Sequence, residues 1–301
     1  MLNPTLNTTR LRILREIAAR GSITAAAEAL WLTPSAVSQQ VSALEREVGV
    51  ELLERTARSV RLTNAGTRLV SHAEKILADC EAAMADLESI GGQITGTVRV
   101  SAFSTAAQAF LLSALQTLAK RLPSLEILST DLEPHEAMPA LKAGQLDVVI
   151  SHEYNLLPPY ADPGIDRTDL LTERMLLALP AAHPLADKSA RLADFASEHW
   201  IVGREATFCR DAVIRAAHLA GFEPIIELQS NDFRVIAHAV RAGLGVALIP
   251  RIADLRGIDR LSLRALEEPR LERTIFLAVR AGSADSPGIR AVLDALIATA
   301  R

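Results

Sequence analysis

The sequence has few cysteines, few aromatic residues and no long apolar run. Its two cysteines, Cys80 and Cys209, stand far apart, which excludes a disulfide framework and a paired-cysteine metal site. Aromatic residues make up only 4%, so apolar cores must consist mainly of Ala, Leu, Val and Ile. The longest stretch without charge, residues 100–119, is rich in Ser, Thr and Gln and is too polar to span a membrane. Residues 1–15 contain no apolar stretch of the signal-peptide kind, so we expect a cytoplasmic protein.

Sequence motifs of common catalytic sites are missing as well. The seven histidines show no HExxH spacing for zinc, and neither a GxSxG nor a GxxxxGK(S/T) motif occurs. Gly243-Leu244-Gly245 lacks the third glycine of a dinucleotide fingerprint and is interpreted as a turn from a helix to a strand. We therefore expect no catalytic residues, no metal and no cofactor.

Basic residues are concentrated at the N-terminus. The whole chain has 32 basic and 36 acidic residues, a net charge of -4, which excludes a surface dominated by nucleic-acid contacts. Residues 1–66, however, contain eight arginines and six glutamates, a net charge of +2. A local basic patch is therefore expected in the N-terminal fifth of the chain.

Apolar residues at three- and four-residue spacing predict three short helices near the N-terminus. Gly21 ends the first helix, and Ser22 is placed to cap the second. Thr33 and Pro34 begin the third helix, which runs to Gly49. Two helices joined by a tight turn form the geometry that lays the second helix into a DNA major groove.

The predicted third helix has an apolar and a polar face. Ser and Gln side chains on the polar face can bond to bases or phosphates, and Gln suits a bidentate contact to adenine. The candidate DNA-contacting residues here are Thr33, Pro34, Ser35, Ser38, Gln39, Gln40, Ser42 and Arg46. The other interpretation is an ordinary solvated surface, which composition alone favours.

A short basic hairpin follows the third helix and makes a solvated surface the weaker of the two interpretations. Val60 and Leu62 alternate with polar residues as in a strand, and Arg55, Arg58 and Arg61 lie within seven residues. Such a hairpin forms a wing suited to phosphates or the minor groove. A basic wing beside a helix-turn-helix is poorly explained as a solvated surface.

The order and spacing of these segments resemble the winged helix-turn-helix of the LysR-type transcriptional regulators. The resemblance covers residues 11–66 and rests above all on five segments: Ala25-Ala26-Ala27-Glu28-Ala29-Leu30, Thr33-Pro34-Ser35-Ala36-Val37-Ser38-Gln39-Gln40, Leu44-Glu45, Gly49-Val50-Glu51-Leu52-Leu53-Glu54-Arg55 and Val60-Arg61-Leu62-Thr63-Asn64-Ala65-Gly66. Gln39 departs from the pattern, because many members carry a basic residue there. The resemblance implies a sequence-specific regulator that binds promoter DNA and a small-molecule effector. RNA polymerase is a further expected partner. The alternative function is that of a two-lobed small-molecule-binding protein, or an enzyme, without a DNA function.

After the wing, apolar residues recur in steps that alternate between four and three. These residues, Leu69, Ala73, Ile76, Cys80, Ala83, Leu87 and Ile90, form a heptad seam on one helix. The seam can pair with an identical helix or pack on the body of its own chain. The resemblance favours pairing, as a homodimer or a homotetramer, with Cys80 as a small buried residue rather than a redox sensor.

From Thr97 onward, apolar strands alternate with amphipathic helices, which predicts a parallel α/β sheet covered on both faces. The resemblance implies two lobes paired as in periplasmic binding proteins, with the last segment returning to the first lobe. The expected organisation is 1–66 for the winged domain, 67–91 for the linker helix and 92–301 for the effector domain, with lobe 1 at about 92–167 plus 269–301 and lobe 2 at about 168–268.

Ligands of such sheets bind where strands end and helices begin. The family's effector site, carried over to this sequence, falls on four such segments. The candidate effector-binding residues are Ser104, Thr105, His152, Glu153, Arg204, Phe208, Ser230 and Asn231. A positive group in the cleft favours a carboxylate, hence an anionic effector.

Six of these eight candidates also have a structural alternative. The Ser and Thr residues among them are equally suited to capping helices. His152 and Glu153 can pair with each other at the surface, and Arg204 can be a counter-ion for Glu205 or Glu198.

Overall fold

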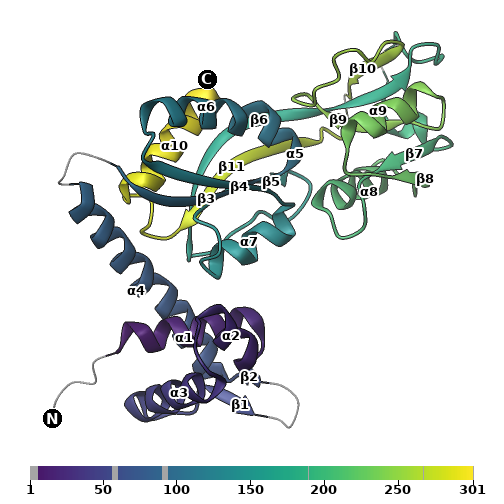
Figure 1. The fold of residues 1–301 in the computed structure, drawn as a ribbon. Helices are drawn as coiled ribbons and strands as arrows, with labels where there is room; N and C mark the ends of the chain where they lie inside the picture. The colour runs from purple at the N-terminus through teal and green to yellow at the C-terminus, as the bar shows by residue number, and fades with distance from the viewer. Residues whose placement is uncertain (1–5, 56–59, 90–93, 189, 267, 301) are drawn as a thin grey trace.

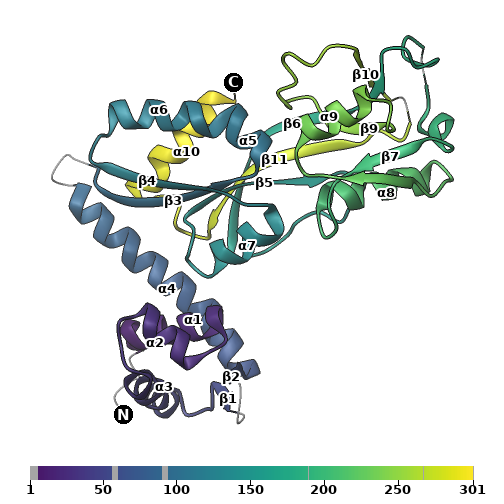
Figure 2. The ribbon, with the colours of Figure 1, turned by 45° about the vertical axis from the view of Figure 1, so that its right-hand side comes forward.

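The computed structural model describes residues 6–55, 60–89, 94–188, 190–266 and 268–300. They form a winged N-terminal domain, a long helix and two α/β lobes (Figures 1 and 2). Within these ranges, no helix combines the length and the apolar character needed to cross a membrane.

The winged domain has three helices and a two-stranded hairpin, as the sequence predicts. Its elements are α1 (Thr8–Arg20), α2 (Ile23–Ala29), α3 (Pro34–Val48), β1 (Leu53–Arg55) and β2 (Val60–Leu62). Gly21 and Gly49 end α1 and α3 in the left-handed region, at φ 65° and 74°. The Ser22 and Thr33 hydroxyls accept backbone N–H groups at the starts of α2 and α3, so these predicted caps are confirmed.

The long helix α4 (Asn64–Ser89) begins before the expected residue 67 and leads from the winged domain to lobe 1 (Figure 1). Its first half does not form the expected dimer seam. Ala73 is fully buried in the core of the winged domain, and Leu69 and Ile76 pack against the same core. The alternative of packing on the chain's own body therefore holds for these three residues.

The second half of α4 is exposed. Cys80 and Ala83 are exposed, Leu87 is 63% exposed, and Ile90 lies outside the described residues. The seam positions that the structure describes as exposed therefore all lie in the C-terminal half of α4.

Lobe 1 is a sheet between helices. Its elements are β3 (Gly96–Ala102), α5 (Ser104–Ala106), a π-helical turn (Ala107–Leu111), α6 (Leu112–Arg121), β4 (Leu125–Asp131), α7 (Pro134–Lys142), β5 (Val148–Tyr154), β11 (Glu272–Arg280) and α10 (Pro287–Thr299). Helices α6 and α10 cover one face and α7 covers the other (Figure 2). Strand alternation explains this division, because Ile275 and Leu277 of β11 join the first core whereas Phe276 and Ala278 join the second.

The sheet is mixed, not parallel as expected. Strand β3 runs parallel to β4 and β5, but β11 runs antiparallel to β5 and to β6 (Ile165–Pro180). Residues 165–174 of β6 pair with β11 in lobe 1, whereas residues 175–180 pair with lobe 2 strands. The chain enters lobe 2 along β6 and comes back along β11, so these two strands must run in opposite directions. The switch between lobes lies inside β6, later than the expected residue 168.

Lobe 2 is the second α/β unit. Its elements are a 3-10 turn (Leu192–Phe195), β7 (His199–Val202), α8 (Phe208–Leu219), β8 (Ile225–Gln229), α9 (Phe233–Arg241), β9 (Ala247–Pro250) and β10 (Leu261–Ala265). Strands β9 and β10 pair with β6, and β7 pairs with β8. Strand β10 was not predicted from the sequence.

We expect buried and exposed positions of α4 to respond differently to a leucine side chain. Ala73→Leu adds volume to a filled core and should destabilise the winged domain by about 1–3 kcal/mol. The control variant His72→Leu, at the neighbouring exposed position of the same helix, should leave its unfolding midpoint unchanged. Chemical denaturation measures both, and equal midpoints would contradict the packing of Ala73.

Candidate functional site: the DNA-binding face and the interlobe cleft

The exposed face of α3 carries hydrogen-bonding and basic side chains. Thr33, Pro34, Ser35, Gln39 and Arg46 are exposed. They lie opposite the buried stripe that holds α3 on the winged domain. This face can therefore approach another molecule without disturbing the core.

Both carboxylates of α3 are engaged within the chain. Glu45 accepts hydrogen bonds from the backbone N–H groups of Leu52 and Leu53, at 2.9 and 3.2 Å, which fixes the start of the wing on α3. Glu47 forms an ion pair with Arg10 of α1. The exposed face of α3 therefore carries no free carboxylate from this helix.

Three candidates lie at the edges of this face. Gln40 is half-buried and its side-chain oxygen accepts from Arg10 Nε at 3.0 Å, so the structure places it beside α1 rather than on the exposed face. Ser38 and Ser42 are half-buried. The Ser42 carbonyl accepts from Arg46 Nε at 3.2 Å.

The wing and the turn before α3 flank this face. Arg61 is exposed on β2, whereas Arg58 and the side chain of Arg55 lie outside the described residues. Trp31, in the turn between α2 and α3, is 95% exposed and has φ 56°. Trp31 is not among the DNA-contacting candidates predicted from the sequence.

The two lobes meet at a narrow space that we call the interlobe slot. Five of the eight effector candidates line it, from both lobes: Ser104, Thr105, His152, Ser230 and Asn231. The slot has a volume of about 30 Å³. The structure therefore brings these sequence-distant residues together around a space hardly larger than one water molecule.

The other three candidates lie elsewhere. Phe208 and Glu153 line a neighbouring cavity, and the Arg204 side chain is exposed and lines neither space. The backbone N–H of Arg204 donates to Asn231 Oδ1 at 2.9 Å. The expectation of an anionic effector rested on Arg204 as the positive group in the cleft. The structure places the Arg204 side chain outside both spaces.

The pairing alternatives for these residues are also wrong. His152 is buried, and Glu153 pairs with Arg167 at 2.7 Å instead. Glu198 pairs with His183 at 3.3 Å, and in the described part of the chain Arg204 forms an ion pair with neither Glu198 nor Glu205.

Helix capping is performed by residues next to the candidates. Thr207 Oγ1 caps α8, and Asp232 Oδ1 caps α9. Ser104 Oγ instead accepts from Gln108, and Ser230 Oγ accepts from the Asp232 N–H. The capping interpretation of the candidate residues is therefore wrong.

A buried ion pair that the sequence reasoning missed lies at the slot. The side chains of Arg273 on β11 and Glu173 on β6 are 1% and 2% exposed, with Arg273 Nε 3.0 Å from Glu173 Oε1. Arg273 Nη2 also donates to Thr105 of lobe 1, and Glu173 Oε2 accepts from the Ile252 N–H of lobe 2. The missed signal was strand alternation, which puts Arg273 on the buried face with Ile275.

Burial sets the protonation of the groups around the slot. It holds the pKa of His152 well below its usual range, with the Arg273 charge as a further cause, so the imidazole is neutral. Burial raises the pKa of Tyr154 and of Cys209, which keeps the thiol protonated. Among the described residues, no three His, Cys, Asp or Glu side chains are grouped to hold a metal ion.

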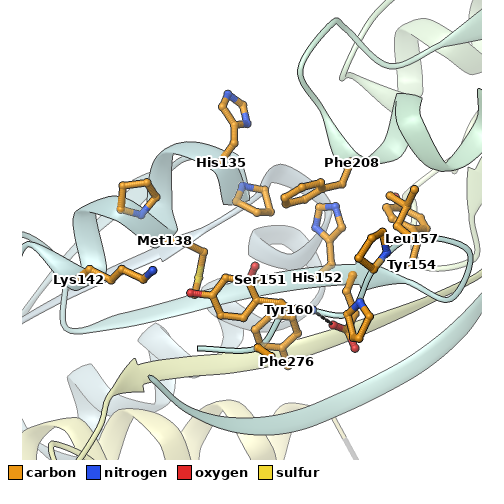
Figure 3. Close-up of a pocket in the computed structure, with 16 residues that line it drawn as sticks. His135, Met138, Lys142, Ser151, His152, Tyr154, Leu157, Tyr160, Phe208 and Phe276 are labelled. Carbon is orange, nitrogen blue, oxygen red and sulfur yellow. Dashed lines mark hydrogen bonds between the residues drawn. The ribbon is translucent and has the colours of Figure 1, made fainter. Parts of the chain in front are cut away.

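A larger space, the α7 cavity, adjoins the slot and has a volume of about 460 Å³ (Figure 3). It is lined by Pro134, His135, Met138, Pro139, Lys142, Ser151, His152, Glu153, Tyr154, Leu157, Pro158, Pro159, Tyr160, Ala161, Phe208 and Phe276. Helix α7 forms one wall, and Phe208 reaches it from lobe 2 (Figure 3). His152 lines both spaces and so connects the α7 cavity to the slot.

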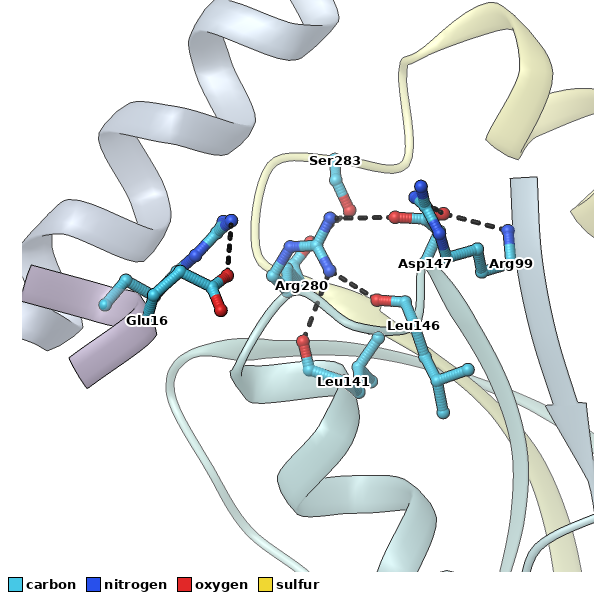
Figure 4. A network of polar contacts seen from close by, with 8 residues as sticks. Glu16, Arg99, Leu141, Leu146, Asp147, Arg280 and Ser283 are labelled. Carbon is cyan, nitrogen blue, oxygen red and sulfur yellow. Dashed lines mark hydrogen bonds and ion pairs between the residues drawn. The ribbon is translucent and has the colours of Figure 1, made fainter. Parts of the chain in front are cut away.

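A polar network anchors the far end of α7 (Figure 4). The buried Arg280 donates to the carbonyls of Leu141 and Leu146 and pairs with Asp147 Oδ1 at 3.1 Å. Asp147 Oδ2 accepts from the Arg99 N–H at 2.8 Å. This network ties the end of α7 to β11, β5 and β3.

Removal of one partner from the Arg273–Glu173 pair should be costly. Glu173→Gln leaves a buried guanidinium without a counter-charge and should lower the free energy of unfolding by about 3–5 kcal/mol. Glu272→Gln is the matched control, because Glu272 pairs with Arg174 on the same two strands but in an exposed position, worth about 1 kcal/mol or less. Denaturant unfolding measures the free energy of unfolding of both variants. Similar losses would show that the buried pair contributes no more to stability than the exposed pair.

Comparison with known proteins identifies both parts of the chain. Residues 8–67 match the model of "Bacterial regulatory helix-turn-helix protein, lysR family", and residues 91–301 match that of the LysR substrate binding domain. The chain is 29% identical over 296 residues to the probable HTH-type transcriptional regulator LrrA of Synechococcus elongatus, covering 98% of each protein. It is 30% identical over 295 residues to the nitrogen assimilation regulatory protein nac of Klebsiella aerogenes, covering 97% of this chain and 94% of the other.

Solved structures show the same fold. A full-length OxyR variant from Pseudomonas aeruginosa superposes with a TM-score of 0.72 at 24% identity, over 99% of this chain and all of the other. Full-length BenM superposes with a TM-score of 0.57 at 25% identity, over 97% and 95% of the two chains. With a matching winged helix-turn-helix and a matching two-lobed domain, the chain belongs to the LysR family of transcriptional regulators.

Proposed function

We propose that this regulator places the exposed face of α3 in the major groove of operator DNA and the wing on the neighbouring backbone. The observation that carries the proposal is the charge distribution on α3, where Gln39 and Arg46 are exposed while Glu45 and Glu47 are engaged inside the chain. Gln39 reads base edges, and Arg61 on the wing contacts phosphates. Thr33, Pro34 and Ser35 position the start of the helix.

Two copies pair through the exposed half of α4. Cys80, Ala83, Met84 and Leu87 give it an apolar surface, with Met84 and Leu87 59% and 63% exposed. A helix that exposes such a stripe is stabilised by an identical partner, and a two-fold dimer matches two operator half-sites. A homotetramer extends the same arrangement. The regulator acts on promoter DNA in the cytoplasm, with RNA polymerase as a further partner and without an enzymatic activity.

The effector domain controls the DNA-binding domains through the relative position of its lobes. Residues of both lobes, such as Thr105 and Asn231, meet at the slot, while β6 and β11 carry the chain across. An effector that binds one lobe arrangement better shifts the population toward it. The angle between paired DNA-binding domains then changes, and with it the DNA bend between half-sites.

Two substitutions separate base reading from phosphate contact. Gln39→Ala should relax base preference at one operator position by about 1–3 kcal/mol, because a base-edge contact is lost. Arg61→Ala should weaken binding to all duplexes and flatten the salt slope by about one, as should Arg58→Ala. Fluorescence anisotropy with operator and random duplexes at several salt concentrations gives both quantities. The controls are Gln229→Ala and Arg215→Ala on lobe 2, and wild-type behaviour of the Gln39 and Arg61 variants would rule out this face.

A charged substitution in the exposed half of α4 tests whether two copies pair there. Leu87→Asp places like charges opposite each other in the pair and should shift the mass measured by light scattering toward the monomer. It should also lower operator affinity, since two half-sites are no longer bound together. Ala73→Leu, on the packed half of α4, should not change the oligomeric state of the folded protein. A Leu87→Asp protein that keeps the wild-type mass would contradict pairing through this segment.

A further inference from the structure

The two spaces beside His152 differ in what they can hold. The interlobe slot, at about 30 Å³, has room for roughly one water molecule. The α7 cavity, at about 460 Å³, lies in the range of roughly 300–1,000 Å³ typical of small-molecule sites. A small organic ligand therefore fits the α7 cavity and not the slot.

The walls of the α7 cavity favour a flat ring. Tyr160 and Phe276 stack with ring centroids 6.2 Å apart and planes at 25°. Tyr154 and Phe208 stand edge-on to His152. Aromatic side chains pack best against another ring, by stacking or by edge-to-face contact.

The charges in the α7 cavity are already neutralised. Lys142 forms an ion pair with Asp162, and Glu153 forms one with Arg167 at 2.7 Å. A charged ligand would lose its hydration on entry without gaining a counter-ion. The cavity therefore favours an uncharged molecule.

Three residues that line the α7 cavity, His152, Tyr154 and Tyr160, have a buried polar atom with no hydrogen-bond partner in the described part of the chain. The Tyr154 hydroxyl lies beside Cys209 and the Tyr160 hydroxyl beside Lys142, whereas His152 Nδ1 has no such neighbour. His152 is 5% exposed. A buried nitrogen without a partner is costly, and a ligand hydroxyl can satisfy it in either imidazole tautomer.

We propose that the α7 cavity binds an uncharged, single-ring aromatic molecule that carries a hydroxyl group, with the hydroxyl bonded to His152 Nδ1 and the ring against Tyr160. Phe208 closes the site from lobe 2, so its occupation is coupled to the position of that lobe. The claim that this molecule is the effector rests on the proposed function, whereas its binding to the cavity is measured without DNA.

Isothermal titration calorimetry on the full chain tests the ligand class with three probes of similar size. We expect p-cresol to bind about tenfold more tightly than toluene, which lacks the hydroxyl, and more tightly than p-toluate, which carries a charge. A preference for p-toluate, or equal affinities for p-cresol and toluene, would overturn the proposal.

Two variants locate the binding site. His152→Phe keeps a ring but removes the nitrogen, and should lower p-cresol affinity about tenfold while leaving toluene unchanged. Ala161→Phe fills the cavity from an exposed loop position and should abolish binding of both. His199→Phe, an exposed histidine on β7 that pairs with Glu227, is the control. Unchanged p-cresol binding in Ala161→Phe, or its loss in Asn231→Ala of the slot, would place the ligand elsewhere.

The two proposals fail in different ways. If no ring compound binds but Gln39→Ala relaxes operator preference, the DNA-binding function stands and the ligand class is wrong. If p-cresol binds as expected but leaves the operator complex unchanged, the ligand site stands and its control over DNA binding is wrong.

Discussion

The ion pair between Arg273 and Glu173 is the constraint on which the arrangement of the lobes depends. Both side chains are almost completely buried, and they join the two strands that carry the chain between the lobes. Separating two charges in such an environment costs several kcal/mol, so motions that keep the pair together are strongly favoured. Thr105 from lobe 1 and the Ile252 N–H from lobe 2 bond to the same pair. Contacts from both parts of the effector domain therefore converge on one point of the two connecting strands.

Internal neutralisation of charge links the two candidate sites. On α3, backbone N–H groups and Arg10 engage the glutamates, which leaves hydrogen-bonding and basic groups toward solvent. In the effector domain, Glu173 neutralises Arg273 at the slot, and Asp162 neutralises Lys142 at the cavity. One surface therefore suits a polyanion and the other suits an uncharged molecule, although the chain as a whole is acidic.

Local signals predicted local structure well. Thr33, Pro34 and Gly49 bound α3 through contacts within a few residues, so sequence alone was sufficient. The heptad spacing of α4 was real, but spacing does not say which partner buries Ala73, and the winged domain competes with a second copy for that face. Arg204 follows a strand as a ligand-binding residue would, yet only the backbone path shows that its side chain is exposed. The Arg273–Glu173 pair joins residues 100 positions apart, and nothing in the local sequence indicates that pairing.

Phe208 belongs to lobe 2 but closes a cavity built almost entirely from lobe 1. Any change in lobe position therefore changes how well the cavity holds its contents. Linkage makes this relation symmetrical, since whatever stabilises one lobe position alters binding at the cavity by the same factor. A promoter that stabilises one arrangement of the lobes therefore changes the ligand affinity of the copy bound to it. A single protein then responds at different ligand concentrations at different genes.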